Sequence, residues 1–141
     1  MTTKMFVNLP VKDLPRAQAF FGKLGFKFNP QFTDETGACM VVSEDAYVML
    51  LTHAKFREFA PQGIADATTT EVLVALSCEN RSQVDQLVAK AIAAGGSTYS
   101  KPKDYGFMYG HGFRDLDGHV WEVFFMDETR SRTAKARSDS I

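Results

Sequence analysis

Hydrophobic and polar residues follow one another along the chain in short blocks, each with the period of a strand or of a helix. Residues 5–11 place apolar side chains at every second position, which predicts a strand with one apolar face. Asp13 then offers a helix N-cap, apolar residues recur at helical spacing over 14–24, and Gly25 is a suitable stop. Three further extended segments are predicted at 26–32, 38–43 and 46–51.

The second half of the chain repeats this order of elements. A connector over residues 53–70 carries Pro61, Gly63 and a run of threonines, and separates the halves. After it we predict a strand at 71–76, a helix capped by Ser82 and ended by Gly95, and strands at 107–114 and 119–126. The turn Asp117-Gly118 joins the last two strands, and we expect His119 to be exposed there.

The repeat predicts an α+β fold of two βαβββ modules, forming curved half-barrel sheets around a cavity with helices on the outer face. We expect one domain over 1–126, with module one at 5–52 and module two at 71–126. Residues 127–141 have almost no apolar content, which predicts a disordered tail.

Composition and charge exclude several classes of partner. The formal net charge is −1 and no long basic run occurs, so we expect no nucleic-acid partner. No apolar run approaches the roughly 20 residues that a membrane span requires. Cys39 and Cys78 lie outside any CxxC pattern, which is typical of free thiols in a cytoplasmic protein.

Three stretches resemble the glyoxalase/bleomycin resistance/extradiol dioxygenase (vicinal oxygen chelate) superfamily. They are FVNLPVKDLPRAQAFFGKLGF at 6–26, AIAAGG at 91–96 and FRDLDGHVWEVFF at 113–125, the last being the most specific. Within the superfamily the chain looks like the subgroup of predicted lactoylglutathione lyases. The resemblance implies a small-molecule ligand and a homodimer, in which paired modules cover the apolar sheet faces.

Family enzymes hold a divalent metal with one side chain from the first and one from the last strand of each module. Counting from the ends of the first strands makes Phe6 correspond to Glu71, and counting from the turns at Ser43 and Asp115 makes Leu50 correspond to Glu122. Phe6 and Leu50 cannot bind a divalent metal, so we expect no metal or other cofactor and no glyoxalase I activity. Any metal that did bind would use Glu71 and Glu122.

Strand parity predicts which side chains face the cavity. Glu71 and Glu122 would form an acidic catalytic pair in an apolar pocket, where burial and mutual repulsion raise one pKa and favour a general base. The predicted ligand-binding residues are Phe6, Asn8, Val48, Leu50, Leu73, Tyr105, Phe107, Tyr109 and His111.

Three functions from different classes remain open on the sequence. The first is a lyase or isomerase that acts on a small oxygenated substrate, with Glu122 or Glu71 as the base. The second is a metal-free protein of the bleomycin-resistance type that binds or sequesters a flat or hydrophobic molecule, which the apolar Phe6 and Leu50 favour. The third is a scaffold or regulatory dimer without a ligand.

Overall fold

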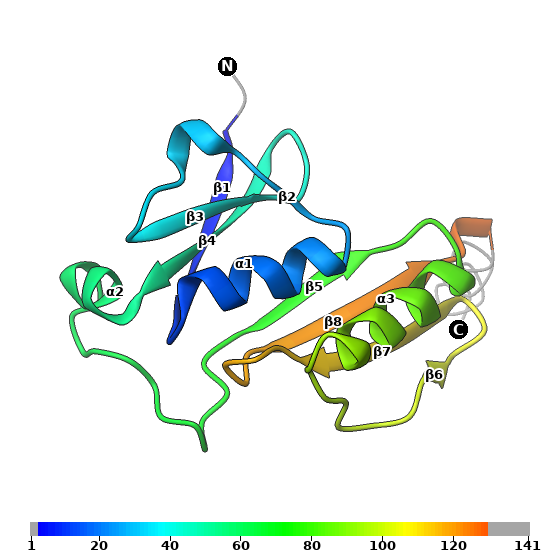
Figure 1. The fold of residues 1–141 in the computed structure, drawn as a ribbon. Helices are drawn as coiled ribbons and strands as arrows, with labels where there is room; N and C mark the ends of the chain where they lie inside the picture. Colours follow the sequence, from blue (N-terminus) through cyan, green and yellow to red (C-terminus); the bar gives the residue numbers. More distant parts are fainter. Residues whose placement is uncertain (1–2, 130–141) are drawn as a thin grey trace. The chain divides into compact units, whose positions relative to one another are not determined.

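The structure of the protein is a computed structural model that describes residues 3–129 (Figure 1). The chain divides into two compact units, Met1–Thr69 and Thr70–Ile141. Each unit is one βαβββ module with its own four-stranded sheet, and neither sheet closes into a barrel. The predicted α+β class and the two modules are therefore confirmed. Part of the predicted tail, residues 130–141, lies outside the described residues.

The first unit carries its strands in the order β1-β4-β3-β2. The parallel pair β1 and β4 lies at one edge, and the other neighbours are antiparallel. Its elements are β1 (Met5–Val11), α1 (Leu14–Lys23), β2 (Lys27–Phe28), the 3-10 turn η1 (Pro30–Phe32), β3 (Gly37–Val41), β4 (Ala46–Thr52) and α2 (His53–Phe59).

The second unit repeats this topology with the strand order β5-β8-β7-β6. Here β5 and β8 form the parallel edge pair. The elements are β5 (Leu73–Ser77), α3 (Arg81–Ala93), β6 (Lys103–Asp104), β7 (Met108–Arg114) and β8 (Val120–Met126). Among the residues described, no helix has both the length and the hydropathy that a bilayer crossing demands.

Side-chain caps fix where the two long helices begin. The Asp13 carboxylate accepts a hydrogen bond from the Arg16 backbone N–H at 3.1 Å, so the predicted cap of α1 is confirmed. The prediction of Ser82 as the cap of α3 is wrong, because Asn80 is the capping residue and accepts from the Gln83 N–H at 2.7 Å. Asn80 has extended backbone angles and a favoured capping side chain, whereas Ser82 already lies in the first turn.

The core of the first unit lies between its sheet and α1. Leu9 pairs with Leu50, and both are buried together with Phe20 and Phe21 of α1. Burying each side chain of this kind contributes roughly 1.5–3 kcal/mol to folding. Phe6 pairs with Tyr47 on the opposite face, stacks on its ring at 4.8 Å between centroids and stays half exposed.

The predicted orientation of Val48 and Leu50 is therefore wrong. Val48 pairs with Val7 and Leu50 with Leu9, which places both side chains on the buried face rather than beside Phe6 and Asn8. The alignment counted from the turn at Ser43 is wrong by one residue in β4. An error of one residue moves every side chain of a strand to the other face.

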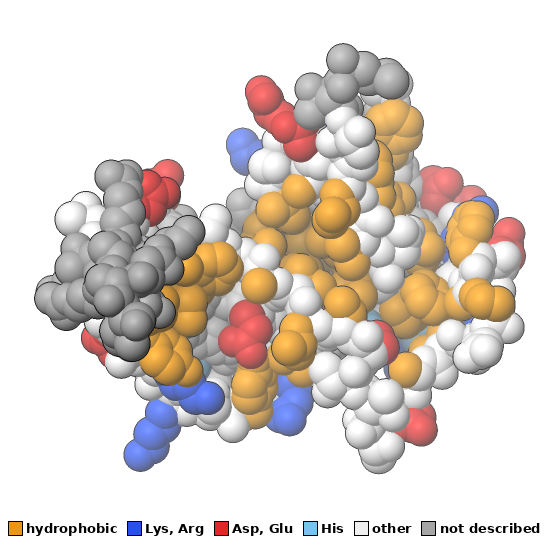
Figure 2. Space-filling view, turned by 180° about the vertical axis from the view of Figure 1, so that it is seen from behind, with side chains coloured by type: hydrophobic (Ala, Val, Ile, Leu, Met, Phe, Trp, Pro, Cys, Tyr) orange, Lys and Arg blue, Asp and Glu red, His pale blue; other side chains and the backbone are white. Residues whose placement is uncertain are grey.

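The second unit buries an aromatic core under α3. Trp121, Val123 and Phe113 are almost fully buried, and Val84 and Val88 face them from the helix. The opposite sheet face carries more accessible residues, among them Leu73 and Met126, and the view from behind shows exposed hydrophobic side chains (Figure 2). This accessible face is the part of the unit that can receive a ligand.

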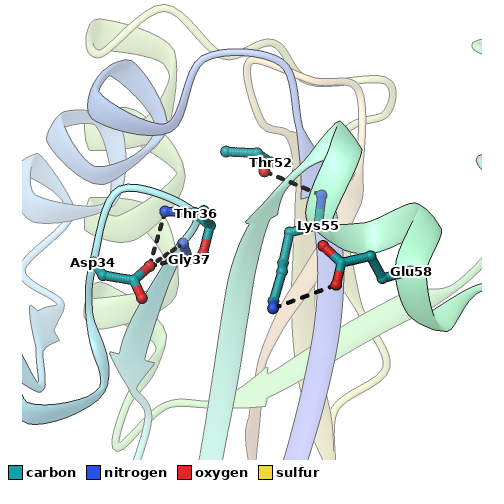
Figure 3. Close-up of polar contacts among 6 residues, drawn as sticks. All are labelled: Asp34, Thr36, Gly37, Thr52, Lys55 and Glu58. Atoms are coloured by element: carbon teal, nitrogen blue, oxygen red, sulfur yellow. Dashed lines mark hydrogen bonds and ion pairs between the residues drawn. The ribbon is translucent and has the colours of Figure 1, made fainter.

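Two local polar motifs hold the ends of the first sheet (Figure 3). One carboxylate oxygen of Asp34 accepts from the Thr36 N–H and hydroxyl, both at 2.8 Å, and from the Gly37 N–H at 3.1 Å. These bonds fix the turn into β3 and hold the pKa of Asp34 below its ordinary value. At the end of β4, the Thr52 hydroxyl caps α2 by accepting from the Lys55 N–H at 3.2 Å.

Candidate functional site

The helix caps show which first-strand positions of the two units correspond. Phe6 lies seven residues before the cap Asp13, and Leu73 lies seven residues before the cap Asn80. Leu73, not Glu71, is therefore the counterpart of Phe6. The two-residue error comes from taking Leu76 as the end of the first strand, and Glu71 itself precedes β5 instead of starting it.

Strand register gives the last-strand positions in the same way. Glu122 pairs with Ala75, two residues after Leu73, and Met49 pairs with Asn8, two residues after Phe6. Met49, not Leu50, is the counterpart of Glu122. Each unit thus presents one pair of corresponding positions on the sheet face away from its helix.

The residues at these four positions do not fit a divalent metal. Phe6 and Leu73 have no donor atom, Met49 offers a soft thioether, and Glu122 alone supplies the hard oxygen or imidazole type of ligand that Zn²⁺, Mn²⁺ or Fe²⁺ requires. Within residues 3–129, no three His, Cys, Asp or Glu side chains are grouped so that they could hold a metal ion. We therefore derive no chemistry through a metal at this site.

A cavity of about 580 Å³ lies on the second unit. This is within the range of small-molecule sites, which are mostly apolar with a few placed polar groups. Its apolar wall comes from Ala75, Met108, Val123, Phe124 and Met126. Its polar groups include Tyr99, Lys101, Lys103, His111 and Glu122.

Glu122 is held in a fixed orientation by Tyr99. The Tyr99 hydroxyl donates to Glu122 Oε1 at 2.8 Å, and the Arg114 guanidinium lies over the Tyr99 ring at 5.2 Å from its centroid. Burial and the bond to the Glu122 carboxylate raise the pKa of the Tyr99 hydroxyl, so it remains a donor at neutral pH. One carboxylate oxygen is thus occupied, and Oε2 is available to a ligand.

The absence of a side chain at Gly112 makes room for this contact. Gly112 pairs with Glu122 across β7 and β8. A Cβ at position 112 would lie 2.0 Å from the Tyr99 hydroxyl oxygen and 2.6 Å from the ring carbon that bears it. Glycine inside a strand often marks such a close approach by another group. Tyr99 was not among the predicted site residues. The glycine at position 112, opposite Glu122, is the feature of the sequence that could have indicated a side chain approaching there.

His111 presents one basic nitrogen. Its Nε2 lies 2.8 Å from the Ser100 carbonyl oxygen and 3.2 Å from the Thr98 hydroxyl, which itself donates to the Gly112 carbonyl. Because a carbonyl only accepts, Nε2 carries the proton in the neutral ring. Nδ1 is then the acceptor, and it has no protein partner among the described residues.

The other ligand-binding residues expected in the second unit do not all line the cavity. Tyr105 joins His111 and Glu122 in the cavity wall, whereas the described wall does not include Leu73, Phe107 or Tyr109. The Tyr109 hydroxyl donates to Asp85 of α3 at 2.6 Å, which places its ring on the helix side. That bond raises the pKa of Tyr109 to about 12.

Glu71 takes part in a separate polar cluster. Its Oε1 lies 2.5 Å from His119 Nδ1, and His119 is buried, so the expected exposure of this histidine is wrong. The reason is the neighbouring Asp115, a buried carboxylate that accepts from the His119 N–H at 3.0 Å and from the Trp121 indole at 2.9 Å. In the part of the chain described, Glu71 does not line the cavity, and the structure does not bring it to Glu122 as a pair.

Comparisons with known proteins agree with this fold. Residues 3–43 match the family described as bleomycin resistance protein-like N-terminal. A hypothetical protein from S. aureus is 32% identical, with 89% of this chain and 95% of that chain covered and a TM-score of 0.74.

More distant structures share the architecture at lower identity. A glyoxalase/bleomycin resistance protein/dioxygenase family enzyme from Burkholderia phytofirmans PsJN is 18% identical, with 89% and 99% of the chains covered and a TM-score of 0.76. The fosfomycin resistance protein FosX from Listeria monocytogenes is 16% identical, with 89% and 91% covered and a TM-score of 0.62. No curated protein matches the chain.

Proposed function

The chain belongs to the glyoxalase/bleomycin resistance/dioxygenase (vicinal oxygen chelate) superfamily, and from this premise we propose that it binds a small molecule without a resident metal. The ligand occupies the cavity of the second unit. One observation carries the proposal: an apolar wall surrounds a single anchored carboxylate, Glu122, while the positions corresponding to it in the fold hold Phe6, Met49 and Leu73.

Binding draws on two kinds of contact. The apolar wall contributes about 25 cal/mol for each Å² of ligand surface that it removes from water. Glu122 Oε2 adds a directional acceptor, and the Tyr99 bond limits the conformational freedom that Glu122 loses on binding. The activity of a lactoylglutathione lyase does not follow, because a metal that polarises vicinal oxygens has no ligand set here.

A metal-independent lyase or isomerase is the second candidate. The observation that favours it is that Glu122, a side chain capable of proton transfer, lies in the cavity wall in an orientation held by Tyr99. In that case Glu122→Gln abolishes turnover of a substrate while apolar ligands still bind.

Calorimetric titration with 2-naphthalenemethanol, a flat neutral probe, tests the proposed function. We expect saturable binding that is unchanged by EDTA. Ala75→Trp fills the cavity and should abolish it, whereas Ala93→Trp, on the exposed surface of α3, should not. Metal analysis after dialysis against Zn²⁺, Ni²⁺ and Mn²⁺ should find no stoichiometric ion. Stoichiometric metal, or probe binding that Ala75→Trp leaves intact, would contradict the proposal.

A further inference from the structure

The charged groups of the cavity differ in their exposure to solvent. Glu122 is half-buried against Ala75 and Phe124, and one of its oxygens has no bond within the described residues. Lys101 and Lys103 also line the cavity, but both are exposed at its rim. An exposed ammonium contributes little to binding because water screens it, while a carboxylate in a partly apolar wall interacts more strongly with a ligand.

Within residues 3–129, Glu122 has no cationic partner of its own. Among the described residues, no Lys, Arg or His lies within ion-pair distance of its carboxylate. Arg114, the nearest candidate on the same strand pair, stacks on the Tyr99 ring instead. The Tyr99 hydroxyl compensates one oxygen by a neutral hydrogen bond and leaves the negative charge in place.

We propose that the cavity selects a cationic ligand: an amine or amidine attached to a flat apolar body, with its charged nitrogen bound by Glu122 Oε2. Tyr99 is the positioning residue for that carboxylate. The apolar wall takes the body of the ligand, and Glu122 Oε2 accepts the charge-assisted N–H bond. The inference rests on the proposed function, since it names the ligand class of the same cavity.

Three probes with one ring system isolate the charge. They are 2-naphthylmethylamine (cationic), 2-naphthalenemethanol (neutral) and 2-naphthoic acid (anionic) at pH 7. Because only the amine carries a charge opposite to that of the Glu122 carboxylate, we expect it to bind about tenfold more tightly than the alcohol, and the acid to bind more weakly than both. The measurement is the dissociation constant by calorimetry.

Glu122→Gln keeps the bond from Tyr99 but removes the charge, so it should reduce the preference for the amine over the alcohol to near unity. Glu79→Gln, an exposed carboxylate outside the cavity wall, makes the same change in net charge and should leave the preference intact. Thermal melting of both variants confirms that they are folded.

The outcomes separate the two proposals. Equal binding of all three probes, or tighter binding of the acid through Lys101 and Lys103, overturns the cationic selectivity but leaves the cavity function standing. Loss of the preference in Glu79→Gln as well as Glu122→Gln also overturns it, because the effect would then come from overall charge. Failure of every probe to bind would contradict both the proposed small-molecule binding in the cavity and the proposed selectivity for a cationic ligand.

Discussion

Replacement of Gly112 by alanine is the sharpest perturbation of the site. The new Cβ would lie 2.0 Å from the Tyr99 hydroxyl and 3.1 Å from the Trp121 carbonyl oxygen, so the Tyr99 ring must move away. The variant loses the hydrogen bond to Glu122, worth about 1.5–3 kcal/mol when the acceptor is charged. Alanine has less backbone entropy than glycine in the unfolded chain, which offsets about 0.4–1 kcal/mol of this loss. We expect a net loss of about 1–2 kcal/mol in the free energy of unfolding.

Gly110→Ala is the matched control in the same strand. A Cβ there meets the Val123 carbonyl oxygen at 3.6 Å and the Phe124 Cβ at 3.8 Å, which are ordinary contacts. We expect this variant to be as stable as the parent or more stable by up to about 1 kcal/mol. Urea unfolding followed by circular dichroism measures both values.

A double-mutant cycle assigns the cost to Tyr99. In a Tyr99→Ala background the ring is absent, so Gly112→Ala should cost no more than Gly110→Ala does. Equal stability of the two glycine variants in the parent, or an undiminished cost of Gly112→Ala without the ring, would refute the reasoning.

Three other predictions address the wider structure. Asp115→Asn should lower the free energy of unfolding by about 1–3 kcal/mol. The amide would turn an N–H donor toward the Trp121 indole or the backbone N–H groups from which the buried carboxylate now accepts hydrogen bonds. Urea unfolding that shows no such loss would contradict this prediction. The pKa of Tyr109 in the folded state is raised to about 12, so its bond to Asp85 stabilises the fold below pH 10 and is lost as pH rises toward 12. The free energy of unfolding should therefore fall less steeply with pH over that range in Tyr109→Phe than in the parent. A homodimer is expected, since Phe6 and Leu73 leave apolar surface 49% and 60% exposed, and sedimentation showing a monomer at micromolar concentration would count against it.

The fold was predictable because its signals are local. Asp13 before an apolar run, and glycines after α1 and α3, mark element ends without reference to tertiary structure. Gly25 and Gly95 indeed have positive φ angles of 105° and 110°. Two repeats of such signals determine the βαβββ order even where a boundary is wrong by two residues.

The site was less predictable because it depends on strand register. Counting back from Leu76 as the end of a strand made Glu71 appear equivalent to Phe6, whereas β5 runs over Leu73–Ser77. A one-residue slip likewise turned Leu50 to the wrong face. Side-chain parity changes with every residue, so a boundary error that leaves the fold intact can reverse which residues face a cavity.

Contacts between distant segments carry no sequence pattern at all. His119 follows a turn and reads as exposed, but Glu71, 48 positions earlier, pairs with it. Tyr99 lies in a short irregular stretch, and only its approach to Gly112 reveals that it orients Glu122. Glu122 lies in the wall of the cavity, and the segment FRDLDGHVWEVFF fixes its place after the turn.

The central claim is that the cavity of the second unit binds a small molecule at Glu122 without metal. Titration of 2-naphthylmethylamine into ¹⁵N-labelled protein in the presence of EDTA, followed by amide chemical shifts, tests it most directly. We expect saturable changes in amide chemical shift concentrated at Tyr99, Lys101, Gly110 and Glu122, with Asp34 and Thr36 unaffected. Saturable shifts that leave Glu122 and Tyr99 unchanged, or no shifts until a divalent metal is added, would contradict it.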